Sequence, residues 1–236
     1  MTSLRSIALG LLLAFFTILP TAAPASRTFN GTSSYIEGST AAVTAEPLTM
    51  ACWFKSASVA APKTLLSIGT SGGTARHQLI EAQNLAVPVR ADSIDSGGSL
   101  ASASATGSIS TGQWYHAAGV WTASNSRAAY LNGANSGTNT TSITVSGTNR
   151  TMVGARISAG TVGSFYAGEI AEAAIWNVAL TADELKSLAA GFSPRLIRPQ
   201  SLVFYAPLIA TVQDIRAGIA LTDTSTTSAT HPPVRQ

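Results

Sequence analysis

Glu169 and Glu172 are the two residues in this sequence whose spacing first raises the question of catalysis. A retaining glycosidase needs two carboxylates on one face, about 5 to 5.5 Å apart, one serving as acid and the other as nucleophile. The run from Glu169 to Glu172 has the composition of a strand, in which successive side chains alternate between faces. Residues three apart then project from opposite faces. The sequence therefore predicts that these carboxylates do not form a catalytic pair.

Histidine and cysteine give no better indication of a nucleophilic centre. We expect His116 to be a structural histidine in the middle of a strand, His77 to lie at a rim, and His231 to lie in the tail. Cys52 has no partner for an intramolecular disulfide and no neighbouring histidine or aspartate, which favours a small buried side chain over a reactive thiol. We predict no catalytic residues and no enzymatic activity.

The elements that position these residues are short strands separated by clusters of Gly, Ser, Thr and Asn. Met50, Cys52 and Phe54 share one face of a strand, and a long strand at 114–122 is followed by a second strand that ends at Asn132-Gly133. This pattern predicts an all-β fold, a two-sheet antiparallel β-sandwich. We expect strands at 27–30, 35–37, 48–55, 64–69, 77–82, 86–91, 100–106, 114–122, 128–131, 151–155, 167–176 and 202–206.

One short helix near the C-terminus completes the predicted architecture. Thr181-Ala-Asp-Glu184 is a capping box, and Gly191 is suited to end the helix. Leu185 and Leu188 fall on one face, so the helix should lie against the sandwich.

The chain divides into three parts. Residues 1–25 have a basic start, an apolar run and a small-residue cleavage site, which predicts a secretory signal peptide and an extracellular protein. An uncleaved membrane anchor is the alternative, and membrane association is expected only in that case. Residues 26–208 are the sandwich, and the Ser/Thr-rich residues 209–236 are expected to be a poorly ordered tail.

The charge pattern argues against a nucleic-acid partner. Only 11% of the residues are charged, and the net charge of +3 comes from basic residues scattered singly along the chain. A nucleic-acid surface needs Lys and Arg clustered on one face.

Several motifs together resemble the concanavalin A-like lectin/glucanase superfamily, in particular its laminin G-like domains. The resemblance covers roughly residues 27–191 and rests on Trp53-Phe54, Gln113-Trp-Tyr-His-Ala117, Ala129-Tyr-Leu-Asn-Gly133, Gly168-Glu-Ile-Ala-Glu172, Ile175-Trp-Asn177 and Ala179-Leu-Thr-Ala-Asp-Glu184. It implies two curved sheets in jelly-roll order, with binding at the concave face or at the rim loops. The alternating Glu-x-Asp-x-Glu pattern of the glucanases is absent.

The resemblance also implies that calcium binding at the rim has to be considered. Asp92 and Asp95 are the acidic pair in a predicted loop, although two carboxylates are few for calcium and solvated turn residues are the favoured interpretation.

A glycan site would need an accessible aromatic platform with polar neighbours. We expect the four tryptophans, which lie in apolar strand patterns, to be core residues. The more accessible candidates for ligand binding are Tyr35, Arg76, Asn135, Arg156 and Tyr166.

The leading hypothesis from the sequence is a secreted, non-catalytic module that binds a carbohydrate or a cell-surface polymer through loops of the sandwich. The rival is a structural or assembly protein, such as a virion or cell-surface component, that packs against itself or another structural protein. A glycoside hydrolase is the third alternative. Fold alone does not decide among them.

Overall fold

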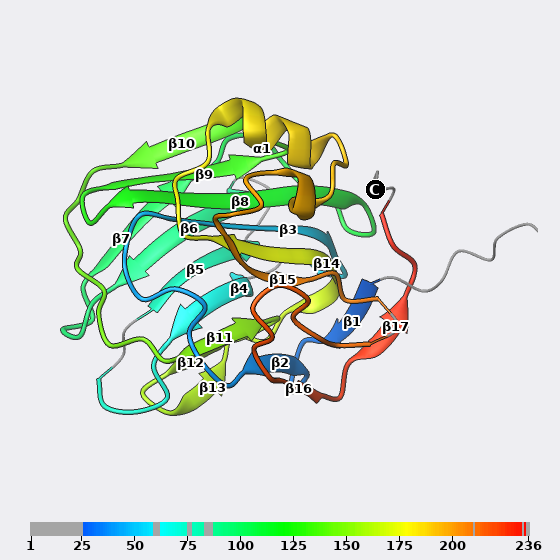
Figure 1. Ribbon diagram of the computed structural model, residues 1–236, viewed down its shortest axis with the longest axis horizontal. Coiled ribbons are helices and arrows are strands. Elements are labelled where there is room, and N and C mark those ends of the chain that lie inside the picture. Colours follow the sequence, from blue (N-terminus) through cyan, green and yellow to red (C-terminus); the bar gives the residue numbers. More distant parts are fainter. Residues whose placement is uncertain are drawn as a thin grey trace, which may run out of the picture.

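Two antiparallel β-sheets packed face to face form the frame of this protein (Figure 1). The computed structural model describes residues 26–58, 62–74, 77–82, 87–209, 211–232 and 234. Sheet A has the order β10 (Asn135–Asn139), β9 (Ser126–Leu131), β8 (Trp114–Ala123), β3 (Leu48–Ser56), β14 (Ala167–Trp176), β1 (Ser26–Asn30) and β17 (Thr227–Ala229), with β15 (Leu202–Ala206) also paired to β14. Sheet B has the order β16 (Leu221–Thr224), β2 (Tyr35–Gly38), β11 (Arg150–Val153), β4 (Lys63–Gly69), β5 (His77–Ala82), β6 (Val89–Ile94) and β7 (Leu100–Ser104).

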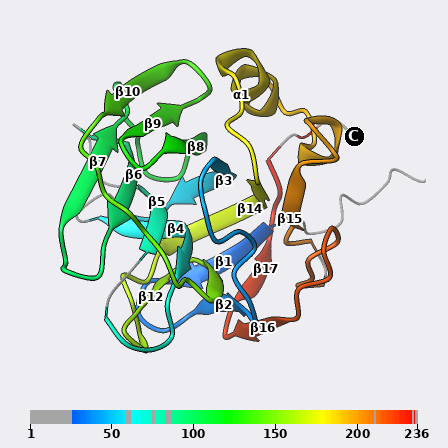
Figure 2. The same cartoon turned by 60° about the vertical axis from the view of Figure 1, so that its left-hand side comes forward.

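Three smaller elements complete the fold: the hairpin β12 (Arg156–Ser158) and β13 (Thr161–Gly163), helix α1 (Ala182–Ala189), and the 3₁₀ turn η1 (Pro194–Leu196). The predicted two-sheet sandwich with one short helix is confirmed. Figure 2 shows helix α1 at the top of the molecule, with β15 of sheet A below it and β6 and β7 of sheet B at the left.

The core lies between the sheets because one face of each strand is apolar. In β3, Met50, Cys52 and Phe54 are fully buried in this core, as the alternation predicts. The Cys52 thiol is free, and burial raises its pKa. Trp121 of β8 also lies in the core, where its indole nitrogen donates to Ser93 Oγ at 2.9 Å. The sandwich is therefore held by packing between its two inner faces.

Most of the predicted strands are present, but their boundaries and number differ from expectation. The strand expected at 86–91 instead begins at Val89, after Pro88, because proline has no N–H to give to a ladder. Strands β10, β12 and β13 were not predicted. They are short and rich in Gly, Ser, Thr and Asn, so they lack the apolar alternation that reveals a strand.

The prediction of a poorly ordered C-terminal tail is wrong for its described residues. Strand β16 pairs with β2 in sheet B, and β17 pairs with β1 in sheet A. The sequence did not predict these two strands because their side chains are mostly polar. Each strand lies at a sheet edge and has little apolar surface of its own. The last two strands thus form one edge of each sheet, β17 beside β1 in sheet A and β16 beside β2 in sheet B.

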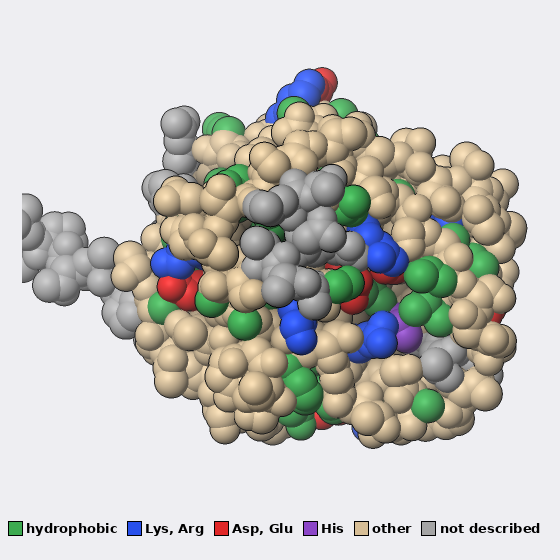
Figure 3. Space-filling model, turned by 180° about the vertical axis from the view of Figure 1, so that it is seen from behind, with side chains coloured by type: hydrophobic (Ala, Val, Ile, Leu, Met, Phe, Trp, Pro, Cys, Tyr) green, Lys and Arg blue, Asp and Glu red, His purple; other side chains and the backbone are tan. Residues whose placement is uncertain are grey.

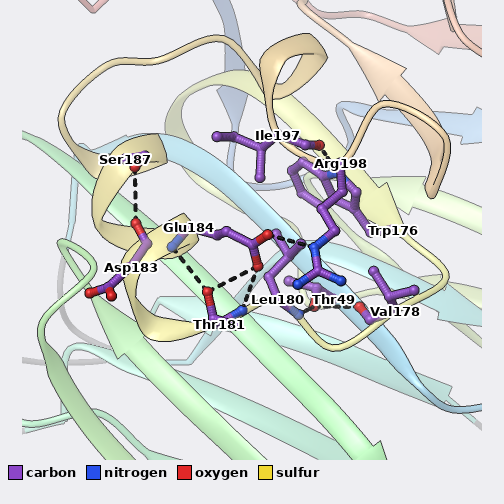
Figure 4. Close-up of polar contacts among 10 residues, drawn as sticks. All are labelled: Thr49, Trp176, Val178, Leu180, Thr181, Asp183, Glu184, Ser187, Ile197 and Arg198. Atoms are coloured by element: carbon purple, nitrogen blue, oxygen red, sulfur yellow. Dashed lines mark hydrogen bonds and ion pairs between the residues drawn. The ribbon is translucent and has the colours of Figure 1, made fainter.

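Helix α1 forms as the capping box predicts, and Figure 4 shows its contacts. Thr181 Oγ1 accepts from the Glu184 N–H, and the Glu184 carboxylate accepts from the Thr181 N–H at 2.7 Å. Leu185 and Leu188 pack with Trp176 and other apolar residues on the outer face of sheet A. The helix therefore covers part of that outer face, over residues of β3, β8, β14 and β15.

Candidate functional site

Charged and polar side chains gather on the outer face of sheet B, the side of the molecule seen in Figure 3. Ile80 and Ala82 of β5 join the core, so His77, Leu79 and Glu81 project to the outer face. In the neighbouring β6, Arg90 and Asp92 project to the same face, with Arg90 opposite Glu81 and Asp92 opposite Leu79. Adjacent strands thus supply both signs of charge to one surface.

Arg90 and Asp92 are fixed by each other. The guanidinium donates from Nε to Asp92 Oδ1 at 3.1 Å and from Nη2 to Oδ2 at 2.6 Å, and Nη2 also donates to Ser102 Oγ at 2.7 Å. Burial raises the pKa of Asp92, although Arg90 acts in the opposite direction. This bidentate pair forms a rigid part of the face.

Glu81 and His77 are buried but use little of their hydrogen-bonding capacity. Glu81 is 5% exposed, and within the described part of the chain its carboxylate accepts one hydrogen bond, from Thr64 Oγ1 at 3.4 Å. Burial raises the pKa of Glu81, and the nearby Asp92 adds to the rise. Neither ring nitrogen of His77 has a hydrogen-bond partner among the described residues. Burial, followed by the charge of Arg156, lowers the pKa of His77 to about 4, so its ring is neutral at neutral pH and offers one donor and one acceptor.

Arg156 reaches this surface from β12, which lies over β4 and β5. The approach is close because β4 ends in Gly69, where an added Cβ would stand 2.4 Å from the carbonyl oxygen of Ile157. The charge of Arg156 acts on His77, Glu81 and Asp92. Within the described part of the chain its guanidinium makes no hydrogen bond or ion pair. The partly exposed Arg156 therefore has unused donors near Glu81 and His77, whose own unused hydrogen-bonding capacity is buried.

An aromatic pair lies on the same side of sheet B, where strands β11 and β4 separate β2 from β5. The rings of Tyr35 in β2 and Phe165 lie 6.2 Å apart, and both side chains are partly exposed. The carbonyl of Ser164 accepts from the Thr64 N–H at 3.1 Å, which ties this pair to the strand that contacts Glu81. We call His77, Glu81, Arg156, Tyr35 and Phe165 the sheet B site.

The structure brings together some of the predicted site residues and separates others. Tyr35, Arg156 and Asp92 lie on the outer face of sheet B. Asn135 lies in β10, at the edge of sheet A, and Arg76 lies outside the described residues. The prediction for Tyr166 is wrong: its ring is 1% exposed and packs edge-on against Phe29, because its hydroxyl bonds to Ser56 Oγ inside the sandwich.

His77, Glu81 and Phe165 of the sheet B site were not among the sequence candidates, and His77 is buried instead of lying at an accessible rim. A signal was present, since alternation along 77–82 puts His77 and Glu81 on one face.

Asp92 and Asp95 do not form the calcium site that was considered. Asp92 lies in β6 with both oxygens bonded to Arg90, whereas Asp95 is in the following turn and accepts from the N–H groups of Gly97 and Ser99. Among the described residues no group of three or more His, Cys, Asp or Glu side chains could hold a metal ion. These residues do not fit calcium.

The two glutamates that raised the question of catalysis have different partners, and the backbone at Glu172 departs from the simple alternation of a strand. A β-bulge between Ala171 and Ala174 interrupts β14, and Glu172 there has a φ of 55°. Its carboxylate is buried between Tyr205 Oη at 2.5 Å and His231 Nε2 at 2.9 Å, while Glu169 pairs with Lys55 at 2.6 Å. His231, expected in a loose tail, is thus anchored to β14.

A serine nucleophile is not formed either. Ser71 lies in a Gly-Thr-Ser-Gly-Gly run at 69–73, and its hydroxyl donates to Asn149 Oδ1 at 3.1 Å rather than to a histidine.

The tryptophans are not all core residues, contrary to expectation. Trp121 and Trp176 are fully buried. Trp53 and Trp114 project from β3 and β8 to the outer face of sheet A and are only partly buried. The reason is the same alternation that points Met50, Cys52 and Phe54 inward.

A family model for the concanavalin A-like lectin/glucanases superfamily matches residues 30–186. The comparison with curated proteins gives no match. Among solved structures, a native heptameric SAP-like pentraxin from Limulus polyphemus is similar with a TM-score of 0.66 and 17% identity, over 89% of this chain and 97% of that one.

Two further similar structures have bound sugars. The CBM40 of the Ruminococcus gnavus IT-sialidase, bound to α2,3 sialyllactose, has a TM-score of 0.56 and 18% identity, over 70% of this chain and 96% of that one. Domain 4 of an extracellular arabinanase from Geobacillus stearothermophilus, in complex with arabinotriose, has a TM-score of 0.53 and 22% identity, over 70% of this chain and 76% of that one. At these identities the likeness shows the fold, and the predicted fold family is confirmed.

Helix α1, with eight residues, is far too short to cross a bilayer, and no other helix in the described ranges is long and apolar enough to do so.

Proposed function

This chain belongs to the concanavalin A-like lectin/glucanases superfamily, and we propose that it is a non-catalytic module that binds carbohydrate at the sheet B site. One observation carries the proposal: buried Glu81 and His77 and the partly exposed Arg156 have unused hydrogen-bonding capacity, on the same side of sheet B as the Tyr35–Phe165 aromatic pair.

The chemistry of these groups suits a sugar. Each sugar hydroxyl both donates and accepts hydrogen bonds, and Glu81 would accept, Arg156 would donate, and the neutral His77 ring would do either. An aromatic ring offers a flat apolar face on which the C–H groups of a sugar ring can lie. Leaving such buried polar groups without partners is unfavourable, so a ligand that pairs them gains affinity from the protein's own unsatisfied groups.

Hydrolysis is not supported by this geometry. Glu81 has a raised pKa, as a general acid would, but the neighbouring Asp92 has both oxygens bonded to Arg90. A second carboxylate with a free oxygen is needed to attack the sugar or activate water. The site therefore favours binding over catalysis.

A glycan array followed by calorimetry tests the proposal, with sialyllactose and arabinotriose as first probes because similar folds hold them. We expect Arg156→Gln, Glu81→Gln and Tyr35→Ala each to weaken binding of the best glycan by about tenfold or more, which is 1.4 kcal/mol. Lys186→Gln, on the exposed side of helix α1, is the matched control for loss of a charge. Silence across the array, or binding that all three variants retain, would refute the proposal.

The proposed setting is extracellular, where the module would meet a glycan or a cell-surface polymer. This rests on the leader-like composition of residues 1–25. Intact-mass measurement of the exported protein tests it. A mass that begins near residue 26 supports export with cleavage, and a full-length mass contradicts it.

A second candidate function, packing against copies of itself or another structural protein, is favoured by one observation. Among the residues that the structure describes, four of the five exposed large apolar side chains belong to the segment 192–215, namely Phe192, Leu196, Ile209 and Ile215. Light scattering after size-exclusion chromatography tests it. Multimers that dissociate on Leu196→Asp support this function, and a monomer at all concentrations excludes it.

A further inference from the structure

A cleft of about 420 Å³ opens at one end of sheet A, where β1, β3 and β14 meet Thr111 and Gly112, and none of its lining residues belongs to the sheet B site. Its polar lining includes Thr28 of β1, Lys55 and Ser56 of β3, Thr111, and Glu169 of β14. Helix α1 covers a different part of sheet A, over Ala51, Ala118 and Trp176, which do not line the cleft.

The strand register aligns three polar residues of this cleft in one row with Trp114, which lies next to the cleft residue Lys55. Thr28 lies opposite Glu169, Glu169 opposite Lys55, and Lys55 opposite Trp114. Adjacent strands are separated by about 4.8 Å, so the row extends over roughly 14 Å. A row of this length suits an extended oligomer better than a single small molecule.

The charges in the row balance each other. Lys55 Nζ lies 2.6 Å from Glu169 Oε1, and the two side chains are 25% and 17% exposed. Ser26 Oγ donates to the other carboxylate oxygen at 3.4 Å. The ion pair is therefore held in place and partly open, and it presents a donor and an acceptor with no net charge.

Two aromatic rings lie beside this ion pair. Lys55 Nζ stands 5.3 Å from the centre of the Trp114 ring, and the partly buried Trp53 packs edge-on against His116 at 5.5 Å. These contacts fix both indoles, because a cation over one ring and an imidazole against the other limit their rotation. An aromatic surface next to a neutral pair of polar groups is the combination that binds sugar rings.

We infer that this row, Thr28–Glu169–Lys55–Trp114, is a second carbohydrate-binding cleft, suited to neutral oligosaccharides. Its ligand would lie along the row, with a sugar ring against Trp114 and hydroxyls on Lys55 and Glu169. The inference does not use the sheet B site. If both sites bind sugar, one chain presents two separate sites and links two strands of a polymer without forming an oligomer.

Tryptophan fluorescence of the full chain reports on this cleft. Trp53 and Trp114 are the partly exposed indoles, whereas Trp121 and Trp176 are fully buried, and the sheet B site as defined contains no tryptophan. The probes are arabinotriose and the neutral hexasaccharides of β-1,3-glucan, cellulose and xylan. We expect at least one to shift the emission and to protect the indoles from acrylamide quenching.

Variants then assign the signal. Trp114→Ala and Glu169→Gln are each expected to weaken the binding seen by fluorescence by about tenfold. Should Trp114→Ala fail to fold, Glu169→Gln, which keeps the shape of the side chain, decides alone. Lys186→Gln is the control. Two results would refute the second cleft without affecting the proposal for the sheet B site. One is a glycan that binds by calorimetry and causes no change in fluorescence. The other is a change in fluorescence that Glu169→Gln retains in full.

Discussion

Asp214 should be one of the most sensitive positions for stability, although it lies in a region without predicted structure. Its carboxylate is 7% exposed and accepts four backbone N–H groups: Tyr205 at 2.9 Å, Arg216 at 3.0 Å, Ala217 at 3.2 Å and Ile219 at 3.0 Å. The Ile215 N–H in turn donates to the Tyr205 carbonyl at 2.9 Å. This side chain therefore attaches the connection that leads to β16 and β17 onto strand β15.

The size of the effect follows from which partners water can replace. In Asp214→Ala the Tyr205 N–H is left buried without an acceptor, which costs about 1–3 kcal/mol. The other three N–H groups belong to partly or fully exposed residues and can form hydrogen bonds with water. Each of them therefore adds to the loss of stability only the small net free energy of one hydrogen bond. We expect a total loss of about 2–4 kcal/mol, which for a chain of this size lowers Tm by about 5–15 °C.

Thermal and urea unfolding followed by circular dichroism measure this loss. Asp214→Asn should lose about half as much, since its oxygen still accepts while its amide group faces the N–H groups of Ala217 and Ile219. Asp183→Asn is the control, because the Asp183 side chain is 90% exposed and pairs only with Lys186. A stability of Asp214→Ala within about 0.5 kcal/mol of the native protein would show that the tail is not bound as described.

Three further changes test other parts of the structure. Thr181→Ala removes the capping box of α1 and should cost about 1 kcal/mol in urea unfolding, whereas Thr181→Ser should retain most of it, and equal losses would contradict the cap. Tyr205→Phe removes a donor from the buried Glu172 carboxylate and should cost about 1–3 kcal/mol, and an unchanged Tm would argue against that bond. Burial raises the pKa of Glu81 above 4.5, so the folded state binds this proton more tightly than the unfolded chain. The stability that protonated Glu81 contributes is therefore full below pH 4.5 and is lost as the pH rises through the folded-state pKa of Glu81. Glu81→Gln should flatten this part of the plot of Tm against pH. A plot for Glu81→Gln that runs parallel to that of the native protein would refute the raised pKa.

The central strands and the helix could be predicted because their signals are local. The inward residues of β3 alternate in sequence, and the capping box of α1 spans four residues. Strands β16 and β17 could not be predicted, because they are held by pairing with β2 and β1 far away in the chain. Polar edge strands have no apolar face of their own to reveal them.

The candidate site shows the same division between local and distant information. Alternation alone puts His77 and Glu81 on one face of β5. That Arg156 lies over them depends on the space above Gly69, which only the folded structure reveals. The β-bulge at Glu172 likewise breaks the two-residue period, so counting residues between Glu169 and Glu172 could not fix their faces.

Glu81 and Asp214 show why a binding role is the better explanation for the sheet B site. Both carboxylates are largely buried, but Asp214 accepts four backbone N–H groups, whereas Glu81, among the described residues, accepts a single 3.4 Å hydrogen bond from Thr64. A carboxylate buried with so few partners destabilises the folded state at neutral pH, and a glutamine would fill the same space without that penalty. Residues that lower stability in this way are characteristic of functional sites. Sugar hydroxyls would supply the hydrogen-bond donors that the Glu81 carboxylate lacks. If Glu81→Gln loses binding and gains stability, the carboxylate lowers the stability of the fold and serves to bind the sugar.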